Sequence, residues 1–371
     1  MARLDLKHGA ARLTAALVDV ESVSGDEKAL ADAIEEALRA YPHLEVVRDG
    51  DSVLARTSLG RAERVILAGH LDTVPIAVDS KGRRNVPSLL EGDWETGTLY
   101  GCGTGDMKAG VAVQLVLAAT VPEPNRDVTY VFYECEEVEA ERNSLRRLVQ
   151  TRADWFEADF AVLLEPSSGI VEGGCQGTMR ARITLRGERA HSGRSWLGDN
   201  AIHKAAAVLR RLADYEPRRP VVDGLEYHEG LNAVGIEGGV AANVIPDTCS
   251  VVVNYRFAPD RDETAAEAHL REVFAGIDAE ITVTDSAPGA RPGLHLPLAA
   301  EFVEAVMGGM DAVPLAKFGW TDVSRFAALG IPGVNYGPGD NSLAHKPDES
   351  VDLGQVVRSA NRMRSWLVDA P

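Results

Sequence analysis

The chain has 371 residues, of which 45% are hydrophobic, and a formal net charge of -18 from 56 acidic and 38 basic side chains. This length predicts two domains, and the acidic balance argues against binding to nucleic acid or an anionic membrane. No apolar run approaches membrane-spanning length, and the first residues lack a signal-peptide pattern. Four cysteines without a Cys-x-x-Cys pair are typical of a reducing compartment, so the cytoplasm is the expected location.

The N-terminal part is predicted to contain two helices. Apolar residues recur at helical spacing from Leu13 to Val18. Ser24, followed three residues later by Glu27, has the pattern of a capping box that opens a second helix running to Leu38. Two short strands are expected next, at 44–47 and 52–56.

A buried strand at 65–68 ends in Gly69 and is followed by His70 and Asp72. Ligands of open α/β sheets lie beyond the carboxyl ends of the strands. His70 could bind a metal through one ring nitrogen while the Asp72 carboxylate holds the other. A polar loop after a strand would carry the same residues, so the pattern gains weight only because it recurs along the chain.

The stretch 101–110 is rich in glycine and contains Asp106. It lacks the spacing of a phosphate-binding loop, and no strand leads directly into it as a dinucleotide-binding fingerprint requires. We interpret the glycines as a tight loop whose backbone approaches a ligand closely. Asp106 stands at the start of a helix predicted over 111–119, where it could cap the helix or bind a metal.

Further carboxylates and a histidine follow later strands. The strand 128–133 leads into Glu134, Glu136 and Glu137, and the strand 160–164 leads into Glu165. Adjacent carboxylates repel one another unless a cation or a proton lies between them, although a solvated acidic turn is the alternative. His345 stands in a loop after a strand-like piece at 333–337.

Five candidate ligands therefore recur in similar settings. They are His70, Asp106, a glutamate of the group Glu134, Glu136 and Glu137, Glu165, and His345. Two imidazoles and three carboxylates without a cysteine suit zinc, cobalt or manganese, and five ligands with one shared carboxylate suit two metal ions.

The segment 178–287 has a different order of predicted strands and helices, which indicates an inserted domain. It is predicted to contain strands at 179–185, 231–236, 249–257 and 281–284 and helices at 200–212 and 262–274. The order β-α-β-β-α-β is the ferredoxin-like plan. Residues 1–177 and 288–371 then form one α/β domain. The open edge strand of the insert is a natural place for a second subunit to pair.

The chain resembles the di-zinc aminoacylase/carboxypeptidase family over nearly its whole length. The matching stretches are 69–75, 103–110, the Glu136-Glu137 pair, 164–166 and 344–347. This resemblance implies a catalytic domain with a zinc-peptidase-like mixed sheet flanked by helices. It also implies that the inserted α+β domain serves as a lid and as the contact surface of a homodimer.

The resemblance also implies roles for the candidate ligands. His70 and Glu165 would hold one zinc ion, Glu137 and His345 would hold the other, and Asp106 would bridge both. Asp72 would orient His70, and Glu136 would be the general base. Amide hydrolysis at neutral pH needs a deprotonated water, a polarised carbonyl and a proton for the departing amine, so a carboxylate beside a metal ligand suits this chemistry.

In the insert, His191 resembles the family's histidine that reaches into a neighbouring subunit's site, where it would stabilise an oxyanion. A surface histidine after a strand is the alternative. Asn243 and Arg256 resemble substrate contacts, and the arginine fork suits a carboxylate-bearing substrate. Further expected substrate contacts are Thr178, Thr321 and Asn341.

The stretches 317–326 and 330–340 resemble family members that remove the succinyl group from N-succinyl-LL-2,6-diaminopimelate. The expected products are succinate and LL-2,6-diaminopimelate, which serve lysine and cell-wall precursor synthesis. Alternatives are another deacylase of acylated amino acids, such as an acetylornithine deacetylase, a dipeptidase, or a catalytically silent binding protein. Four positions depart from the family pattern, of which the last two bear on the substrate: Cys102, Val138, Gln176 and Trp320.

Overall fold

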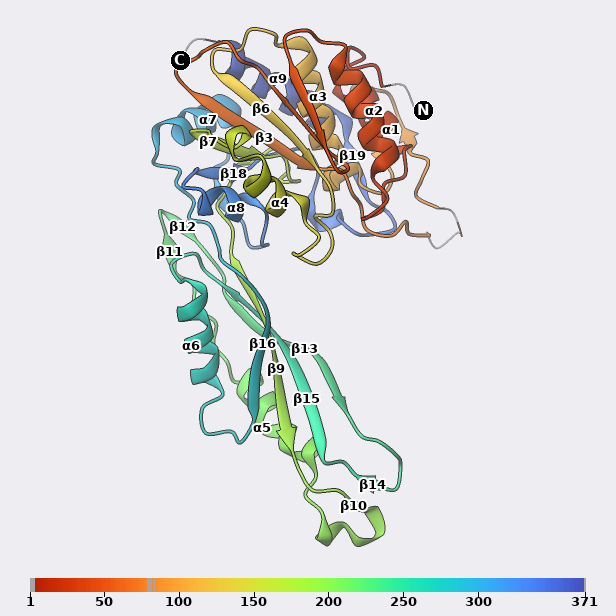
Figure 1. Cartoon of the computed structure of the whole chain (residues 1–371), viewed down its shortest axis with the longest axis vertical. Coiled ribbons are helices and arrows are strands. Elements are labelled where there is room, and N and C mark those ends of the chain that lie inside the picture. The colour runs from red at the N-terminus through yellow and green to blue at the C-terminus, as the bar shows by residue number, and fades with distance from the viewer. Residues whose placement is uncertain (1–3, 79–81, 83, 370–371) are drawn as a thin grey trace. The chain divides into compact units, whose positions relative to one another are not determined.

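The computed structural model describes residues 4–78, 82 and 84–369. The chain forms two compact units (Figure 1). The first unit comprises 1–173, 292–315 and 325–371, and the second comprises 174–291 and 316–324. The second unit therefore extends beyond the insert expected at 178–287. Its additional segment 316–324 is tied in by hydrogen bonds that the sequence pattern does not reveal, from Gln176 N to Lys317 O (3.2 Å) and from Ser324 Oγ to Pro288 O (2.7 Å).

An eight-stranded mixed sheet forms the centre of the first unit, in the order β1-β2-β6-β3-β7-β18-β8-β17. The strands β6, β3, β7 and β18 are parallel neighbours, whereas β1, β2 and β8 pair antiparallel. Their bounds are β1 Glu45–Asp49, β2 Ser52–Arg56, β3 Arg64–His70, β6 Asp127–Tyr133, β7 Phe160–Leu163, β8 Glu172–Gly173, β17 Leu315–Ala316 and β18 Gly333–Asn335. A three-stranded sheet contains β4 Leu89–Glu91, β5 Thr98–Tyr100 and β19 Ser350–Asp352.

Both faces of the central sheet are covered. In β3, Val65 and Leu67 belong to the main core with α1, α3 and α9, while Ile66 and Ala68 are equally buried on the opposite face. Burial on both faces explains why the parallel strands read as continuous apolar runs. The helices of this unit are α1 Ala10–Val18, α2 Lys28–Arg39, α3 Ala109–Thr120, α4 Ser144–Thr151, α7 Pro297–Met307 and α9 Leu353–Val368, with α8 Val323–Ala328 beginning at the boundary between the units.

The register of the parallel strands brings their carboxyl ends to one level. His70 pairs with Tyr133, and Ala68 pairs with Leu163. The loop after β6 therefore begins beside His70, and Glu165 lies two residues beyond its own strand at a similar height. This register is what gathers side chains from three separate strands.

The second unit contains a four-stranded antiparallel sheet in the order β13-β15-β9-β16, with α5 and α6 sharing one core with it. The element order β9-α5-β13-β15-α6-β16 is the predicted one. The bounds are β9 Gly177–Arg186, α5 Ala201–Ala213, β13 Gly230–Gly238, β15 Thr248–Phe257, α6 Glu263–Val273 and β16 Glu280–Ala287. Short pairs are formed by β10 Ala190–His191 with β14 Val244–Ile245, and by β11 Val221–Val222 with β12 Leu225–Glu226.

The predicted capping box is wrong. Helix α2 begins at Lys28, and Glu27 at its N-cap position makes no side-chain capping hydrogen bond. The Ser24 hydroxyl instead donates to Asp72 Oδ2 at 2.7 Å. A tertiary contact has therefore replaced the local one that the spacing suggested.

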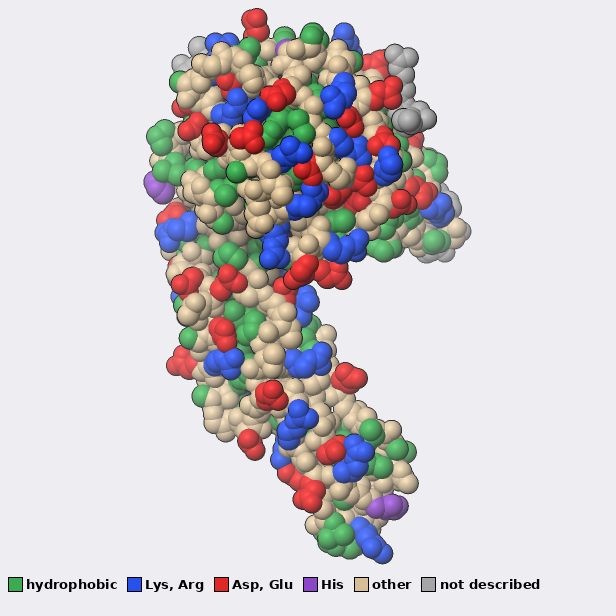
Figure 2. Space-filling view, viewed as in Figure 1, with side chains coloured by type: hydrophobic (Ala, Val, Ile, Leu, Met, Phe, Trp, Pro, Cys, Tyr) green, Lys and Arg blue, Asp and Glu red, His purple; other side chains and the backbone are tan. Residues whose placement is uncertain are grey.

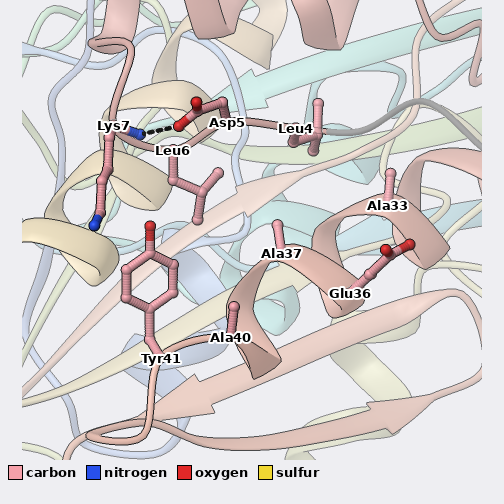
Figure 3. A pocket seen from close by; sticks show the side chains of 9 residues that line it. All are labelled: Leu4, Asp5, Leu6, Lys7, Ala33, Glu36, Ala37, Ala40 and Tyr41. Carbon is pink, nitrogen blue, oxygen red and sulfur yellow. Dashed lines mark hydrogen bonds between the residues drawn. The ribbon is translucent and has the colours of Figure 1, made fainter.

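A surface pocket of ≈ 530 Å³ lies between the segment Leu4–Lys7 and α2 (Figure 3). Tyr41 lies at one end of this pocket, and Lys7 N donates to Asp5 Oδ1 at 3.0 Å at its rim. None of its lining residues is a candidate ligand or substrate contact.

The visible surface mixes acidic and basic side chains rather than segregating them (Figure 2). Within the described residues, no helix combines the length and the apolarity needed to cross a bilayer.

Candidate metal centre

Potential ligand atoms gather at the carboxyl edge of the central sheet. In each of three overlapping groups, one potential ligand atom of every residue lies within 4.8 Å of those of the other two. The groups are His70 with Asp106 and Glu165, Asp106 with Glu137 and His345, and His70 with Glu136 and Glu137. Two of these groups share Asp106, the residue expected to bridge. All five predicted ligands, together with the predicted base, are thus brought into one cluster.

His70 is held by contacts at both ring nitrogens. Nδ1 lies 3.0 Å from the Asp72 carbonyl oxygen and 3.6 Å from its carboxylate, so the nearer contact comes from the backbone rather than from the predicted side chain. A carbonyl only accepts, so Nδ1 carries the proton and Nε2 is the nitrogen available to a metal. Nε2 lies 3.1 Å from Asp106 Oδ1. Burial alone would lower the pKa of His70, but Asp106 and Asp72 raise that pKa well above its usual value.

His345 joins the same cluster from the far end of the chain. Its Nε2 lies 2.8 Å from Glu137 Oε1 and 3.3 Å from Asp106 Oδ2. These two carboxylates raise the pKa of His345 to about 10. Burial would raise the pKa of Asp106, but the hydrogen bonds from His345 and His70 hold that pKa below its usual range. The cluster is therefore strongly attractive to positive charge.

Asp72 fixes the loop that carries Glu136 and Glu137. Its side chain is fully buried and accepts hydrogen bonds from Glu136 N (2.9 Å), Glu137 N (3.0 Å) and the Ser24 hydroxyl. One carboxylate therefore orients the backbone of both glutamates. This role is broader than the orientation of His70 that the sequence predicts.

Glu349 fixes the glycine-rich loop in the same manner. Its buried carboxylate accepts from Gly103 N (3.0 Å), Gly105 N (2.9 Å) and Asp106 N (3.1 Å), and burial raises its pKa to about 7. Gly103 has φ 76°, which favours glycine. Asp106 itself is not helical (φ -113°, ψ 91°) and lies three residues before α3, so the helix-cap alternative does not hold.

The donor set fits divalent metal ions. Imidazole nitrogens and carboxylate oxygens converge without sulfur, and each imidazole lies within hydrogen-bonding distance of a carboxylate. Such a set suits zinc, cobalt or manganese, and the shared Asp106 suits two ions.

The candidate residues of the second unit form separate groups. His191 is exposed, and its Nδ1 accepts from Gly193 N at 3.0 Å. Asn243 lies beside it, because His191 pairs with Val244 and Ser192 N donates to the Asn243 carbonyl oxygen at 2.9 Å. The predicted oxyanion histidine and one predicted substrate contact thus share one end of the unit.

Thr178 and Arg256 are cross-strand partners at the other end of β9 and β15. Asn254 links them, since Arg256 Nε donates to Asn254 Oδ1 (3.2 Å) and Asn254 Nδ2 donates to Thr178 Oγ1 (3.3 Å). Burial lowers the pKa of Arg256. Thr321 is buried in this unit, whereas Asn341 is exposed at the start of the short helix η4 Asn341–Leu343 in the first unit.

Two of the atypical positions have packing roles in the second unit. The Gln176 side-chain amide is buried and donates to the His228 carbonyl oxygen at 2.6 Å. The Trp320 indole donates to the Pro288 carbonyl oxygen at 3.2 Å. The Gln176 amide therefore ties the start of β9 to the residues before β13, and Trp320 ties the segment 316–324 to the residues after β16.

The family model described as peptidase family M20/M25/M40 matches residues 66–369. The chain belongs to this family. A Mycobacterium tuberculosis relative provisionally named succinyl-diaminopimelate desuccinylase DapE is 53% identical over 365 residues, covering 98% of this chain and 99% of that protein. The succinyl-diaminopimelate desuccinylase of Corynebacterium glutamicum is 47% identical over 372 residues, covering 98% of this chain and 97% of that protein.

The M20 fold extends to distant members with solved structures. An M20 family metallo-carboxypeptidase from Sulfolobus solfataricus superimposes with a TM-score of 0.80 at 16% identity, covering 96% of this chain and 98% of that one. The α/β mixed-sheet architecture is therefore that of the M20 family.

Three residues around the centre were missed by sequence reasoning. Glu349 lies four residues after His345 and carries no sequence signal of a role, while the spacing of Ser24 and Glu27 predicts a helix cap. Only the spatial proximity of distant segments reveals them. The one local signal was the spacing of Ser24 and Glu27, and it favoured another structure.

Proposed function

We propose that this protein is a two-metal amide hydrolase that converts N-succinyl-LL-2,6-diaminopimelate to succinate and LL-2,6-diaminopimelate. The observation that carries the hydrolytic part is the shared position of Asp106 between two ligand groups, with Glu136 beside them. The substrate rests on the relatives at 53% and 47% identity, whose names specify this reaction and whose lengths this chain covers almost completely.

His70 and Glu165 would hold one ion, Glu137 and His345 the other, and Asp106 both. When bound, the two ions, zinc in this proposal with cobalt or manganese as substitutes, would polarise the scissile carbonyl and acidify the attacking water. His70 offers Nε2 because its Nδ1–H is engaged by the Asp72 carbonyl.

Glu136 is the proton carrier in this proposal. Asp72 fixes the backbone of both Glu136 and Glu137. In this proposal the Glu137 side chain serves as a metal ligand, and the Glu136 side chain remains available to carry a proton. The Glu136 carboxylate would take the proton of the attacking water and deliver it to the departing amine nitrogen. The neighbouring glutamates thus divide two tasks that a single carboxylate could not perform together.

The second unit would supply dimer contacts, substrate contacts and an oxyanion donor. Its edge strand β13 and the adjoining helix α5 expose apolar side chains: Val234 60%, Ile236 57%, Ile202 40% and Leu209 40%. An edge strand flanked by exposed apolar residues favours pairing with a second copy. His191 would then act in the partner's site. The expected substrate contacts are Asn243, Arg256, Thr178, Thr321 and Asn341, of which Arg256 would bind a carboxylate of the substrate.

A cytoplasmic location accompanies this proposal. The four cysteines are all unpaired and buried. Thiols persist in a reducing compartment.

The test is amine release from N-succinyl-LL-2,6-diaminopimelate by protein loaded with zinc, beside N-acetylornithine and a small set of dipeptides. We expect a strong preference for the succinylated substrate. Preference for another compound would keep the hydrolytic proposal and reassign the substrate. No hydrolysis of any of them, with two ions bound per chain, would contradict the proposal.

A further inference from the structure

The segment Ser22–Glu27 lies along the exit of β3 instead of capping α2. Thr73 N donates to the Ser22 carbonyl oxygen (2.9 Å), and Ser24 N donates to the Thr73 carbonyl oxygen (3.1 Å). The buried Ser22 hydroxyl also donates to the Leu71 carbonyl oxygen at 2.7 Å. These bonds lock the segment onto the chain that joins His70 to Thr73. Its side chains are thereby brought beside the loop that carries Glu136 and Glu137.

Ser24 completes the hydrogen bonding of Asp72. The Ser24 hydroxyl and Glu137 N both donate to Asp72 Oδ2, at 2.7 and 3.0 Å, while Glu136 N donates to Oδ1 at 2.9 Å. Asp72 is fully buried, so a lost donor cannot be replaced by bulk water without rearrangement. Without the hydroxyl, the carboxylate that orients both glutamates would be less well fixed.

Glu27 holds the beginning of the same loop. Its Oε1 accepts from Cys135 N at 3.1 Å and from Gly25 N at 2.9 Å, and the side chain is almost fully buried. Cys135 has φ 59°, a left-handed conformation that non-glycine residues adopt only when neighbouring contacts maintain it. The acceptor on Glu27 therefore supports the sharp turn that leads from β6 into Glu136.

We propose that Ser24 and Glu27 are positioning residues for the hydrolytic reaction. Together they attach the N-terminal segment to the loop Cys135–Glu137, Ser24 through Asp72 and Glu27 directly. They hold Glu136 where it can exchange a proton with the attacking water and Glu137 where it can bind metal. This inference rests on the proposed function.

The experiment compares variants that delete the hydrogen-bonding group of Ser24 or Glu27 with conservative variants that keep it. Ser24→Ala and Glu27→Ala delete the hydroxyl and the acceptor, whereas Ser24→Thr and Glu27→Gln keep a hydroxyl and a carbonyl acceptor. Thr57→Val is the matched control, because the buried Thr57 hydroxyl donates to the buried Asp127 at 2.8 Å, near the amino ends of β3 and β6. Each variant is measured for kcat, KM, zinc affinity, thermal unfolding and hydrogen exchange of the amides of Cys135, Glu136 and Glu137.

Ser24→Ala and Glu27→Ala are expected to lower kcat on the order of tenfold with little change in KM, and to speed exchange of the three amides by a similar factor. Ser24→Thr and Glu27→Gln should recover most of both losses. Thr57→Val should lower the unfolding temperature and leave kcat and these amides unchanged. If Glu27→Ala does not fold, Ser24→Ala and its threonine rescue decide the question.

Normal kcat and normal exchange in Ser24→Ala would overturn the inference, as would an equal loss of kcat in Thr57→Val. Failure of the proposed function is distinguishable, because the wild-type protein would then hydrolyse none of the test substrates. Amide exchange and zinc affinity would still report whether Ser24 and Glu27 hold the loop.

Discussion

The two units hold their candidate residues in different ways. In the first unit, the carboxylates of Asp72 and Glu349 are buried, and each accepts three hydrogen bonds that fix a loop carrying a predicted ligand. In the second unit, His191 lies on the surface and accepts a hydrogen bond from Gly193, two residues away. A metal site needs fixed donors before the ion arrives, whereas a residue that meets a substrate or a partner can be ordered on contact.

The largest effect is expected from Glu136→Gln. Loss of a general base typically costs 10²–10⁴-fold, so we expect kcat to fall on the order of 10³-fold while two ions per chain remain bound. Metal content by atomic emission and turnover by amine release check this. Glu137→Gln is the comparison variant, and it should lose metal. Metal loss in Glu136→Gln instead would exchange the roles of the two glutamates.

His191→Ala tests whether an exposed residue of the second unit is nonetheless required. Loss of an oxyanion donor costs about 10²–10³-fold in kcat, and we expect that loss without a change in metal content or unfolding temperature. The matched control is His8→Ala, which removes another exposed histidine, in the first unit. Unchanged kcat in His191→Ala would contradict the oxyanion role and indicate a surface histidine without a function in catalysis.

Mixing two inactive variants tests whether His191 acts in the metal centre of a second subunit. If the proposed dimer forms with His191 in the partner's site, subunits carrying Glu136→Gln and subunits carrying His191→Ala should recover part of the activity when mixed, because one site in the mixed dimer regains both residues. Subunit exchange is verified first with a tagged copy. Absence of recovery after verified exchange would argue against a site shared between subunits.

Glu349→Gln should weaken zinc binding by roughly 10–100-fold, because the amide group cannot accept from three backbone N–H groups as the carboxylate does. Competition with a chromogenic chelator measures the affinity. Glu123→Gln, at an exposed position, is the control. Equal affinities in the two variants would contradict the role given to Glu349.

The smallest expected effect is the release of a proton when zinc binds. With the pKa of His345 raised to about 10, this histidine is protonated at pH 8 in protein stripped of metal, and it must lose that proton to bind zinc. Zinc affinity should therefore rise with pH up to about 10. The ion pairs of His345 stabilise the stripped protein fully below the unfolded pKa of about 6.5, and that contribution is lost as pH rises through the folded value.

Calorimetric titration in buffers of different ionisation enthalpy counts the released protons, and we expect at least one per chain. Affinity that does not change between pH 7 and 9 would contradict the raised pKa.

The sequence predicts those features that depend on neighbouring residues. Apolar runs that lead to His70, Glu137 or Glu165 predict buried strands followed by candidate ligands, and alternation predicts the ferredoxin-like sheet. Glu349 and Glu27 act on residues 243 and 108 positions away, and nothing local announces such contacts. The spacing of Ser24 and Glu27 fits two structures, and tertiary hydrogen bonds select the one that propensity alone does not favour.

The order of the segments along the chain has a consequence for biosynthesis. Asp106 is made before the second unit, whereas His345 and Glu349 are made after it. At about 5–20 residues per second, the ribosome needs roughly 10–50 s to add the 239 residues from Asp106 to His345. During that interval the nascent chain carries an acidic half-site without its last imidazole. A product truncated before His345 would lack one of the proposed ligands however well its earlier segments fold.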